Sequence, residues 1–251
     1  MKLQQKTALI FIGLLIVLMI LVSVFSSMVI LASYADLEQQ YVEKDLAQAV
    51  TRVDDETNTL SAIVSDWGPW DDAYNYVQGT KPDFIQTNLV PDTFNNLRVN
   101  VIIIANRKGG IVYSGAYNSS DQGMVPVPED LVSQLNLENP LLNMSDPRRD
   151  NRGIVLLPDH PMILVSRPIV RTDFSGEPQG VVIMGRYLDS SEVERLALLT
   201  RPTLRFTRVT DLSLPDTLVQ NLRKKNTDAG RIVEPLDRDT IMGYALLRDL
   251  Y

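Results

Sequence analysis

The densest group of residues able to do chemistry lies in one segment, residues 66–77. This segment holds both tryptophans of the chain, two of its nine tyrosines and three aspartates. Aromatic faces bind cationic or planar small molecules, and carboxylates bind cations. The segment is therefore the first candidate for a ligand-binding site. We expect five of its side chains to contact a ligand: Trp67, Trp70, Asp71, Asp72 and Tyr74.

Each of these residues also has a structural interpretation. Aromatic side chains at helical spacing commonly pack in a core. Aspartates in the first turn of a helix complement its dipole, which would explain Asp71 and Asp72 without any ligand. A divalent-ion site needs more oxygen ligands than two adjacent aspartates supply, and no loop has calcium-binding spacing. We therefore predict no dedicated metal site.

Three side chains outside the segment extend the candidate site. Tyr113, Arg167 and Arg186 lie in strand-like runs that are otherwise rich in apolar residues. An arginine that faces a pocket would bind a ligand carboxylate. The alternative is that both arginines face solvent and that Tyr113 belongs to the core.

A catalytic constellation is missing from the sequence. The single histidine, His160, lies in a turn between two prolines, and no nucleophile-elbow pattern occurs. Residues 108–110 form a hairpin turn without the spacing of a phosphate-binding loop. The chain has no cysteine, which excludes disulfides, thiolate chemistry and cysteine-ligated zinc. We predict no enzyme activity and no cofactor, and an exterior hydrolase is the less favoured alternative.

The elements that must position these residues begin with an apolar run. Residues 7–35 carry no charge, and only Lys2 and Lys6 precede them as charged side chains. About 20 apolar residues are enough to span a bilayer. A cleaved signal peptide is the alternative, although its apolar core is usually only about 7–15 residues long. We predict a transmembrane helix at residues 7–33.

The distribution of charge sets the orientation and excludes some partners. Because the basic pair precedes the span, residues 1–6 are predicted to be cytoplasmic and residues 34–251 extracytoplasmic. After the span, 22 basic residues stand against 31 acidic ones, a formal net charge of −9. This charge argues against nucleic acid and against flat adhesion to anionic lipid. The predicted partners are the membrane and a small-molecule ligand.

A long helix is predicted to follow the span without a break. Apolar residues recur at three- and four-residue spacing from Tyr34 to Trp67, which is typical of an amphipathic helix of about thirty residues. Gly68 and Pro69 end it, and Pro69 is predicted to start a short new helix. The long helix either packs on its own domain or pairs with a second copy. We expect a homodimer through it.

Strand-like and helical runs alternate in the rest of the chain. The fold predicted for the exterior part is one α+β domain with an antiparallel sheet. Helical turns are expected at 83–97, 128–137, 190–200 and 216–224. Strands are expected at 99–105, 111–114, 153–157, 162–170, 180–187, 203–209, 231–235 and 240–247.

Residues 66–77 also carry a resemblance to a known family. Their Asp-Trp-x-x-Trp-Asp-Asp-x-Tyr string, followed by Asn88-Leu89, Asn95-Asn96-Leu97 and residues 101–104, resembles the fourth type of the CHASE sensor domains. These are extracytoplasmic modules of bacterial and archaeal signalling proteins. The resemblance covers roughly residues 36–251. It implies a PAS-like or Cache-like fold, with a long helix on one side of an antiparallel sheet and ligands on the other.

The resemblance also implies a role in signalling. Family members usually return through a second span to a cytoplasmic histidine kinase, diguanylate cyclase or methyl-accepting region. The sequence shows neither a second span nor an output domain, so we expect a fragment that stops before them, with a stand-alone sensor as the alternative. The predicted function is the membrane-anchored, extracytoplasmic ligand-sensing domain of a signal-transduction receptor. A protein-interaction module without a small-molecule ligand is the main alternative.

Overall fold

The computed structural model describes residues 3–136, 138–197, 204–210, 214–224, 231–235, 240–247 and 249–250. The chain forms two compact units. One contains Met1–Ala47 and Asp216–Leu246, and the other contains Gln48–Pro215 and Leu247–Tyr251. The candidate site belongs to the second unit, which we call the sheet unit.

A single helix, α1, runs from Leu3 to Trp67 and is 65 residues long. It confirms the predicted continuity between the apolar run and the amphipathic helix. Within it, the 20 residues Phe11–Ile30 are long and apolar enough to cross a membrane, and none of this segment is buried. Apolar side chains that no protein covers are what a lipid-facing segment requires.

The first unit adds a small hairpin that packs against α1 at Val42 and Leu46. Strand β7 (Arg231–Pro235) pairs antiparallel with β8 (Ile241–Ala245), and α7 (Asp216–Lys224) buries Leu218 and Leu222. A Cβ atom on Gly243 would lie 2.9 Å from Val42 Cγ1, so β8 packs closely against α1 here.

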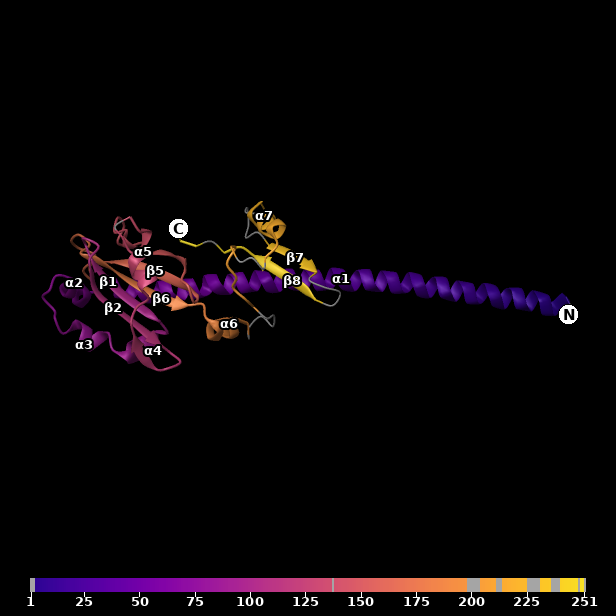
Figure 1. Ribbon diagram of the computed structural model, residues 1–251, viewed down its shortest axis with the longest axis horizontal. Helices are drawn as coiled ribbons and strands as arrows, with labels where there is room; N and C mark the ends of the chain where they lie inside the picture. Colours follow the sequence, from indigo (N-terminus) through magenta and orange to yellow (C-terminus); the bar gives the residue numbers. More distant parts are fainter. Residues whose placement is uncertain are drawn as a thin grey trace. The chain divides into compact units, whose positions relative to one another are not determined.

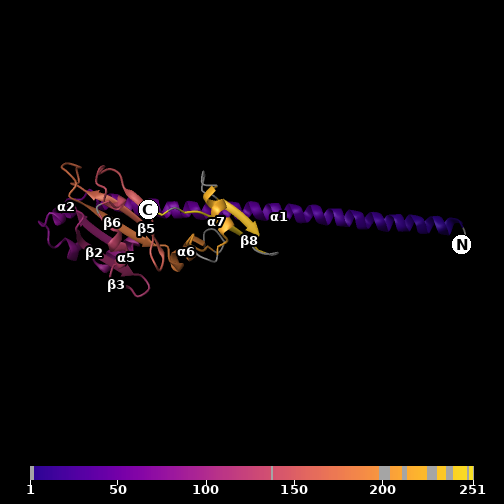
Figure 2. The same ribbon diagram turned by 45° about the horizontal axis from the view of Figure 1, so that its top comes forward.

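The sheet unit is built on six antiparallel strands in the order β3-β2-β1-β6-β5-β4 (Figures 1 and 2). Apolar and β-branched residues dominate its central strands, which suits strands buried on both faces. The bounds of the strands are β1 Val101–Asn106, β2 Ile111–Asn118, β3 Gly123–Val125, β4 Asn151–Leu156, β5 Pro161–Ile169 and β6 Gly180–Tyr187.

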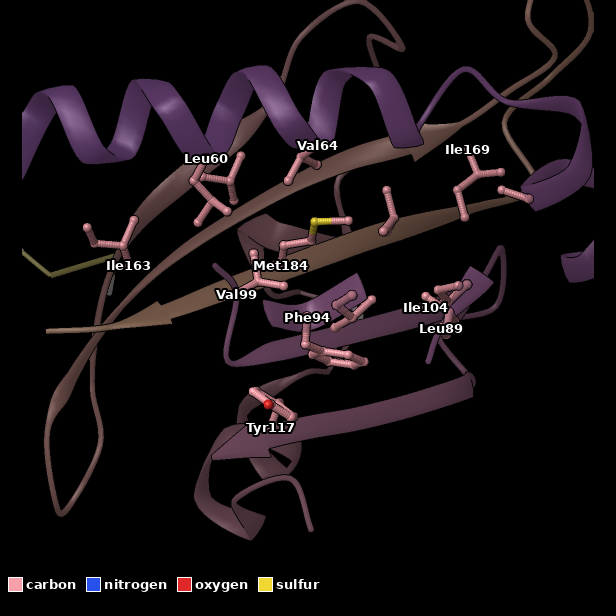
Figure 3. Close-up of a cluster of buried hydrophobic side chains, with 14 of the residues drawn as sticks. Leu60, Val64, Leu89, Phe94, Val99, Ile104, Tyr117, Ile163, Ile169 and Met184 are labelled. Carbon is pink, nitrogen blue, oxygen red and sulfur yellow. The ribbon is translucent and has the colours of Figure 1, made fainter. Parts of the chain in front are cut away.

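Both faces of this sheet are covered. One face packs against α1 and three short helices, α2 (Asp71–Val77), α3 (Phe84–Asn88) and α4 (Pro91–Leu97). Figure 3 shows Leu60 and Val64 pointing from α1 towards this face, where Met184 lies. The other face is covered by α5 (Glu129–Gln134) and the short helix η1 (Pro140–Leu142). The predicted α+β class, with a long helix on an antiparallel sheet, is confirmed.

Two local predictions are wrong. Pro69 does not begin a helix: α2 starts at Asp71, after an extended Trp70. The reason is that Pro69 forms a parallel bridge with Val170, which holds the junction in an extended conformation. The strand predicted at 203–209 is also wrong for its described part, because residues 204–210 pair with no strand. Residues 198–200 of the helix predicted at 190–200 and residue 137 of the one predicted at 128–137 lie outside the described residues.

Candidate ligand-binding site

Four aromatic rings form a continuous row where α1 ends. Trp67 and Trp70 meet edge to face, with ring centroids 5.3 Å apart. Trp70 meets Phe84 at 5.2 Å, and Phe84 stacks on Tyr76 at 5.1 Å. We call these four residues the aromatic row. Phe84, an inner member of the row, is fully buried, whereas both tryptophans and Tyr76 are half-buried, so the tryptophan end of the row can be reached from solvent.

The aspartates beside the row have partners in the protein. Asp71 and Thr172 exchange two hydrogen bonds: the Thr172 amide donates to Asp71 Oδ1 at 3.1 Å, and the Asp71 amide donates to Thr172 Oγ1 at 3.3 Å. Asp72 forms an ion pair with Lys81 at 3.2 Å. Both carboxylates lie in the first turn of α2, where the helix dipole favours negative charge.

The loop between β5 and β6, residues 171–179, closes over α2. The Arg171 guanidinium lies 4.7 Å from the centre of the Tyr74 ring, a cation–π contact, and Tyr74 is only 5% exposed. Gly176 has a φ of +78°, which suits glycine, and a Cβ there would lie 3.6 Å from the Tyr74 hydroxyl. Tyr74 is therefore held between its helix and this loop.

Arg167 lies on β5 against the end of α1. A Cβ on Gly68 would clash with Arg167 Cγ. Only glycine at this position leaves room for the aliphatic part of the Arg167 side chain at the α1–α2 junction. Arg167 Nε is buried without a hydrogen-bond partner, and it is the one such side-chain atom in the part of the chain that the structure describes. Arg167 is half-buried as a whole, so the alternative of a side chain in open solvent does not describe it.

Arg186 lies far from the aromatic row. Gly180, which begins β6, pairs with Ile169 beside the α1–α2 junction, and Arg186 is six residues further along the strand. At about 3.3 Å per residue this separates them by roughly 20 Å. Arg186 nevertheless faces inward, with 4% of its surface exposed. The structure thus brings Trp67, Trp70, Asp71, Asp72, Tyr74, Tyr113 and Arg167 to one region and places Arg186 at the other end of the sheet.

A buried group of charges surrounds Arg186. Its guanidinium pairs with Glu56 of α1 and donates to the carbonyl oxygens of Leu97 and Arg98. Arg195, on α6 (Ser190–Ala197), binds both Glu56 and Glu192. We call Glu56, Arg186, Glu192 and Arg195 the Glu56 ion cluster. It ties α1 to the end of β6 and to α6.

Tyr113 belongs to the same layer as the aromatic row. Burial raises the pKa of Tyr113, and the neighbouring Tyr76 raises it further. The Tyr76 hydroxyl donates to the carbonyl oxygen of Val112 at 2.8 Å. A Cβ on Gly115 would clash with the Tyr113 hydroxyl, so the Tyr113 ring fits here because residue 115 has no side chain.

Sequence reasoning missed several residues of this region. Phe84 joins the aromatic row, Arg171 and Thr172 hold α2, and Glu56 neutralises Arg186. An arginine inside an apolar strand is a signal for a buried acidic partner. The sequence does not say which of the many acids that partner is.

Acid is expected to weaken the sheet unit through Glu56. Burial alone would raise the pKa of Glu56, but hydrogen bonds and positive charge from Arg195 and Arg186 lower it below its ordinary value of 4.5. A lowered pKa in the folded state adds stability above the ordinary value, and this stability is lost as pH falls through the folded-state pKa. Urea denaturation between pH 7 and pH 3 would measure the free energy of unfolding. This free energy should fall below about pH 4.5 in the wild type, and the fall should be smaller in Glu56→Gln. Equal acid sensitivity in both proteins would contradict this role.

Comparison with known proteins places these features in a family. The CHASE4 domain family matches residues 52–207. The methanogenesis regulatory histidine kinase FilI of Methanothrix harundinacea (strain 6Ac) is 28% identical over 239 residues, which cover 95% of this chain and 26% of that protein. This chain therefore spans about a quarter of that relative.

Solved sensor domains resemble the chain more distantly. A domain of a sensory box/GGDEF family protein from Vibrio parahaemolyticus gives a TM-score of 0.45 at 14% identity, covering 62% of this chain and 63% of that one. The E. coli DcuS sensor domain gives 0.35 at 15% identity, covering 57% and 97%. Since both TM-scores are low, the assignment depends on the match over residues 52–207, which includes the aromatic row and most of the sheet unit. That match covers more than half of the chain, and the protein belongs to the CHASE4 domain family of sensor domains.

Proposed function

We propose that this chain is the membrane-anchored, extracytoplasmic ligand-sensing part of a receptor of the histidine kinase, diguanylate cyclase or chemoreceptor type. The proposed boundaries are residues 1–6 in the cytoplasm, 7–33 in the membrane and 34–251 outside. One observation carries the proposal: α1 is a single helix that includes the membrane-type segment Phe11–Ile30 and ends at Trp67 in the aromatic row. A change at the aromatic row therefore acts on the same helix that crosses the membrane.

The proposed binding surface uses the tryptophan end of the aromatic row. Trp67 and Trp70 offer half-buried rings, and Arg167 offers a buried donor without a partner. Tyr74 and Asp71 support this surface from α2 through their contacts with the β5–β6 loop. A ligand changes the output only if it binds one arrangement of α1 more tightly than another, because a ligand with equal affinity for both states shifts nothing.

The first test is a ligand screen on the full chain in lipid nanodiscs. Thermal unfolding would be followed with acetate, amino acids, putrescine, nucleobases and Mg²⁺. A ligand at about 100 times its Kd should add roughly 2.7 kcal/mol of stability. We expect at least one compound to stabilise the wild type and to lose its effect in Trp70→Ala. Met124→Ala, an exposed position on β3, is the control and should keep the effect. An unchanged response in Trp70→Ala would contradict the proposed site.

A homodimer through α1 is part of the proposal. Tyr34, Leu37 and Tyr41 are exposed by 63%, 44% and 64%, on the part of α1 that follows the membrane-type segment. Apolar and aromatic side chains left open along a helix suit pairing with a second copy. Cross-linking of a Leu37→Cys variant in nanodiscs should give a covalent dimer, whereas Glu43→Cys, on an exposed polar position, should cross-link less. The alternative function, an interaction module without a ligand, predicts the dimer or a heteromeric complex but no stabilising compound.

A further inference from the structure

We infer that the ligand of the proposed site is an anion, a small carboxylate with an apolar body, and that Arg167 binds it. This inference rests on the proposed function and names the ligand class for that same site. The sequence leaves two ligand classes open, a cation held by the aspartates and an anion held by an arginine, and the contacts of these side chains favour the anion.

Asp71 and Asp72 already have partners in the protein. Asp71 accepts from the Thr172 amide, and Asp72 is neutralised by Lys81. A cationic ligand would have to replace these contacts and leave Lys81 without its acidic partner. The two aspartates therefore fix α2 and its covering loop, and the charge of Asp72 is neutralised by Lys81.

Among the described residues, two of the three basic side chains near the site have partners in the protein and one does not. Lys81 is paired with Asp72, and Arg171 lies over the Tyr74 ring. The Arg167 side chain has neither kind of contact: it forms no ion pair or hydrogen bond with any residue that the structure describes, and its Nε is buried. A buried donor without a partner is rare in folded proteins and calls for a specific explanation. A bound anion that displaces the atoms now covering Nε supplies that explanation, because it would accept hydrogen bonds and neutralise the charge.

The chemistry of the guanidinium favours a carboxylate. Nε and one terminal nitrogen of an arginine present two parallel N–H groups that match the two oxygens of a carboxylate. Arg167 reaches the junction because Gly68 has no side chain, and Gly68 follows Trp67 directly. Trp67 directly precedes Gly68 and Trp70 is two residues after it, so both indole rings belong to the junction that Arg167 crosses. They would cover the apolar body of a ligand whose carboxylate is held by Arg167.

A purely structural role for Arg167 makes a different prediction. The arginine lies at the C-terminal end of α1, where the helix dipole favours a cation. If that were its whole function, replacement by methionine would destabilise the protein at every ligand concentration. If the role of Arg167 is to bind an anion, Arg167→Met removes an unpartnered buried donor and should leave the unliganded protein as stable as the wild type.

The experiment uses the full chain in nanodiscs with two matched probes, phenylacetate and phenethylamine, at constant ionic strength. Thermal unfolding and tryptophan fluorescence are both measured, since both tryptophans of the chain lie in the site. We expect saturable stabilisation and a fluorescence change with phenylacetate only. The response should disappear in Arg167→Met and weaken at least tenfold in Arg167→Lys, which keeps the charge but lacks Nε. Sodium chloride and sodium sulfate at the same ionic strength control for general salt effects.

The outcomes separate the two proposals. Binding of phenethylamine that is lost in Trp70→Ala overturns the anion inference and keeps the sensor site. A phenylacetate response that persists in folded Arg167→Met also overturns the inference, and Arg167→Gln replaces this variant if it does not fold. No response to either probe, nor to the compounds of the wider screen, overturns both proposals.

Discussion

Arg186→Ala is expected to lower the free energy of unfolding of the sheet unit by about 3–5 kcal/mol, the usual cost of removing one partner of a buried ion pair. The Arg186 side chain is 5% exposed and that of Glu56 13%, so water screens this pair poorly. Removing the guanidinium leaves the Glu56 carboxylate with Arg195 alone, and it leaves the carbonyl oxygens of Leu97 and Arg98 without this donor. Burial lowers the pKa of Arg186 and the charge of Glu56 opposes this, so the pair is held ionised by mutual contact.

Two control variants test whether the expected loss of stability comes from breaking a buried ion pair. Arg107 and Glu177 form an ion pair at the surface, with side chains 56% and 71% exposed, and Arg107→Ala should cost at most about 1 kcal/mol. The double variant Glu56→Leu/Arg186→Met should recover much of the loss, because apolar side chains of similar size can replace a buried pair. Urea denaturation followed by tryptophan fluorescence reports on the sheet unit. A loss for Arg186→Ala no larger than that for Arg107→Ala would contradict the buried pair.

The Glu56 ion cluster also bears on signalling. Glu56 lies on α1, whereas Arg186 and Arg195 lie on β6 and α6, so the cluster fixes the position of α1 on the sheet within this unit. Any displacement of α1 on ligand binding must either carry these partners along or break their contacts. Variants of the cluster should therefore change the response to a ligand even though they lie about 20 Å from the aromatic row.

Local patterns in the sequence predicted the elements of the fold well. The three- and four-residue spacing of apolar side chains predicted α1 as far as Trp67, where Gly68 and Pro69 end it. The β-prone run at 180–187 corresponds to β6. Such patterns work because helix periodicity, β-branched residues and chain-breaking residues act over a few positions.

Contacts between distant residues could not be predicted. Pro69 was expected to start a helix because nothing nearby reveals its bridge to Val170. Thr172 is 101 residues from Asp71, and Glu56 is 130 residues from Arg186. Residues 204–209 have a strand-like composition, but a strand also needs a partner, which a sequence pattern does not specify. For the same reason the sequence placed Arg186 with the aromatic residues, whereas the structure separates them.

Phe84→Ala is expected to lower the free energy of unfolding by about 3–5 kcal/mol, the usual range for truncating a buried aromatic side chain. Phe84 is fully buried and lies between two rings, with Trp70 at 5.2 Å and Tyr76 at 5.1 Å. Such aromatic pairs add about 0.5–1.5 kcal/mol beyond their buried area. The loss therefore combines a cavity under α2 with two broken ring contacts.

This substitution separates the core function of the aromatic row from its proposed ligand-binding function. Phe84→Leu fills most of the volume, so it should cost clearly less than Phe84→Ala, and Met124→Ala on the exposed edge of β3 should cost under about 0.5 kcal/mol. Because Phe84 is fully buried beside Trp70, whereas Trp70 is half-buried, Phe84→Leu should retain binding of any compound that Trp70→Ala loses. Urea denaturation and the ligand screen together test this. If Phe84→Ala cost no more than Met124→Ala, the row would not be part of the core. If Phe84→Leu and Trp70→Ala lost binding equally, the effect of Trp70 on binding would reflect disturbed packing rather than contact with a ligand.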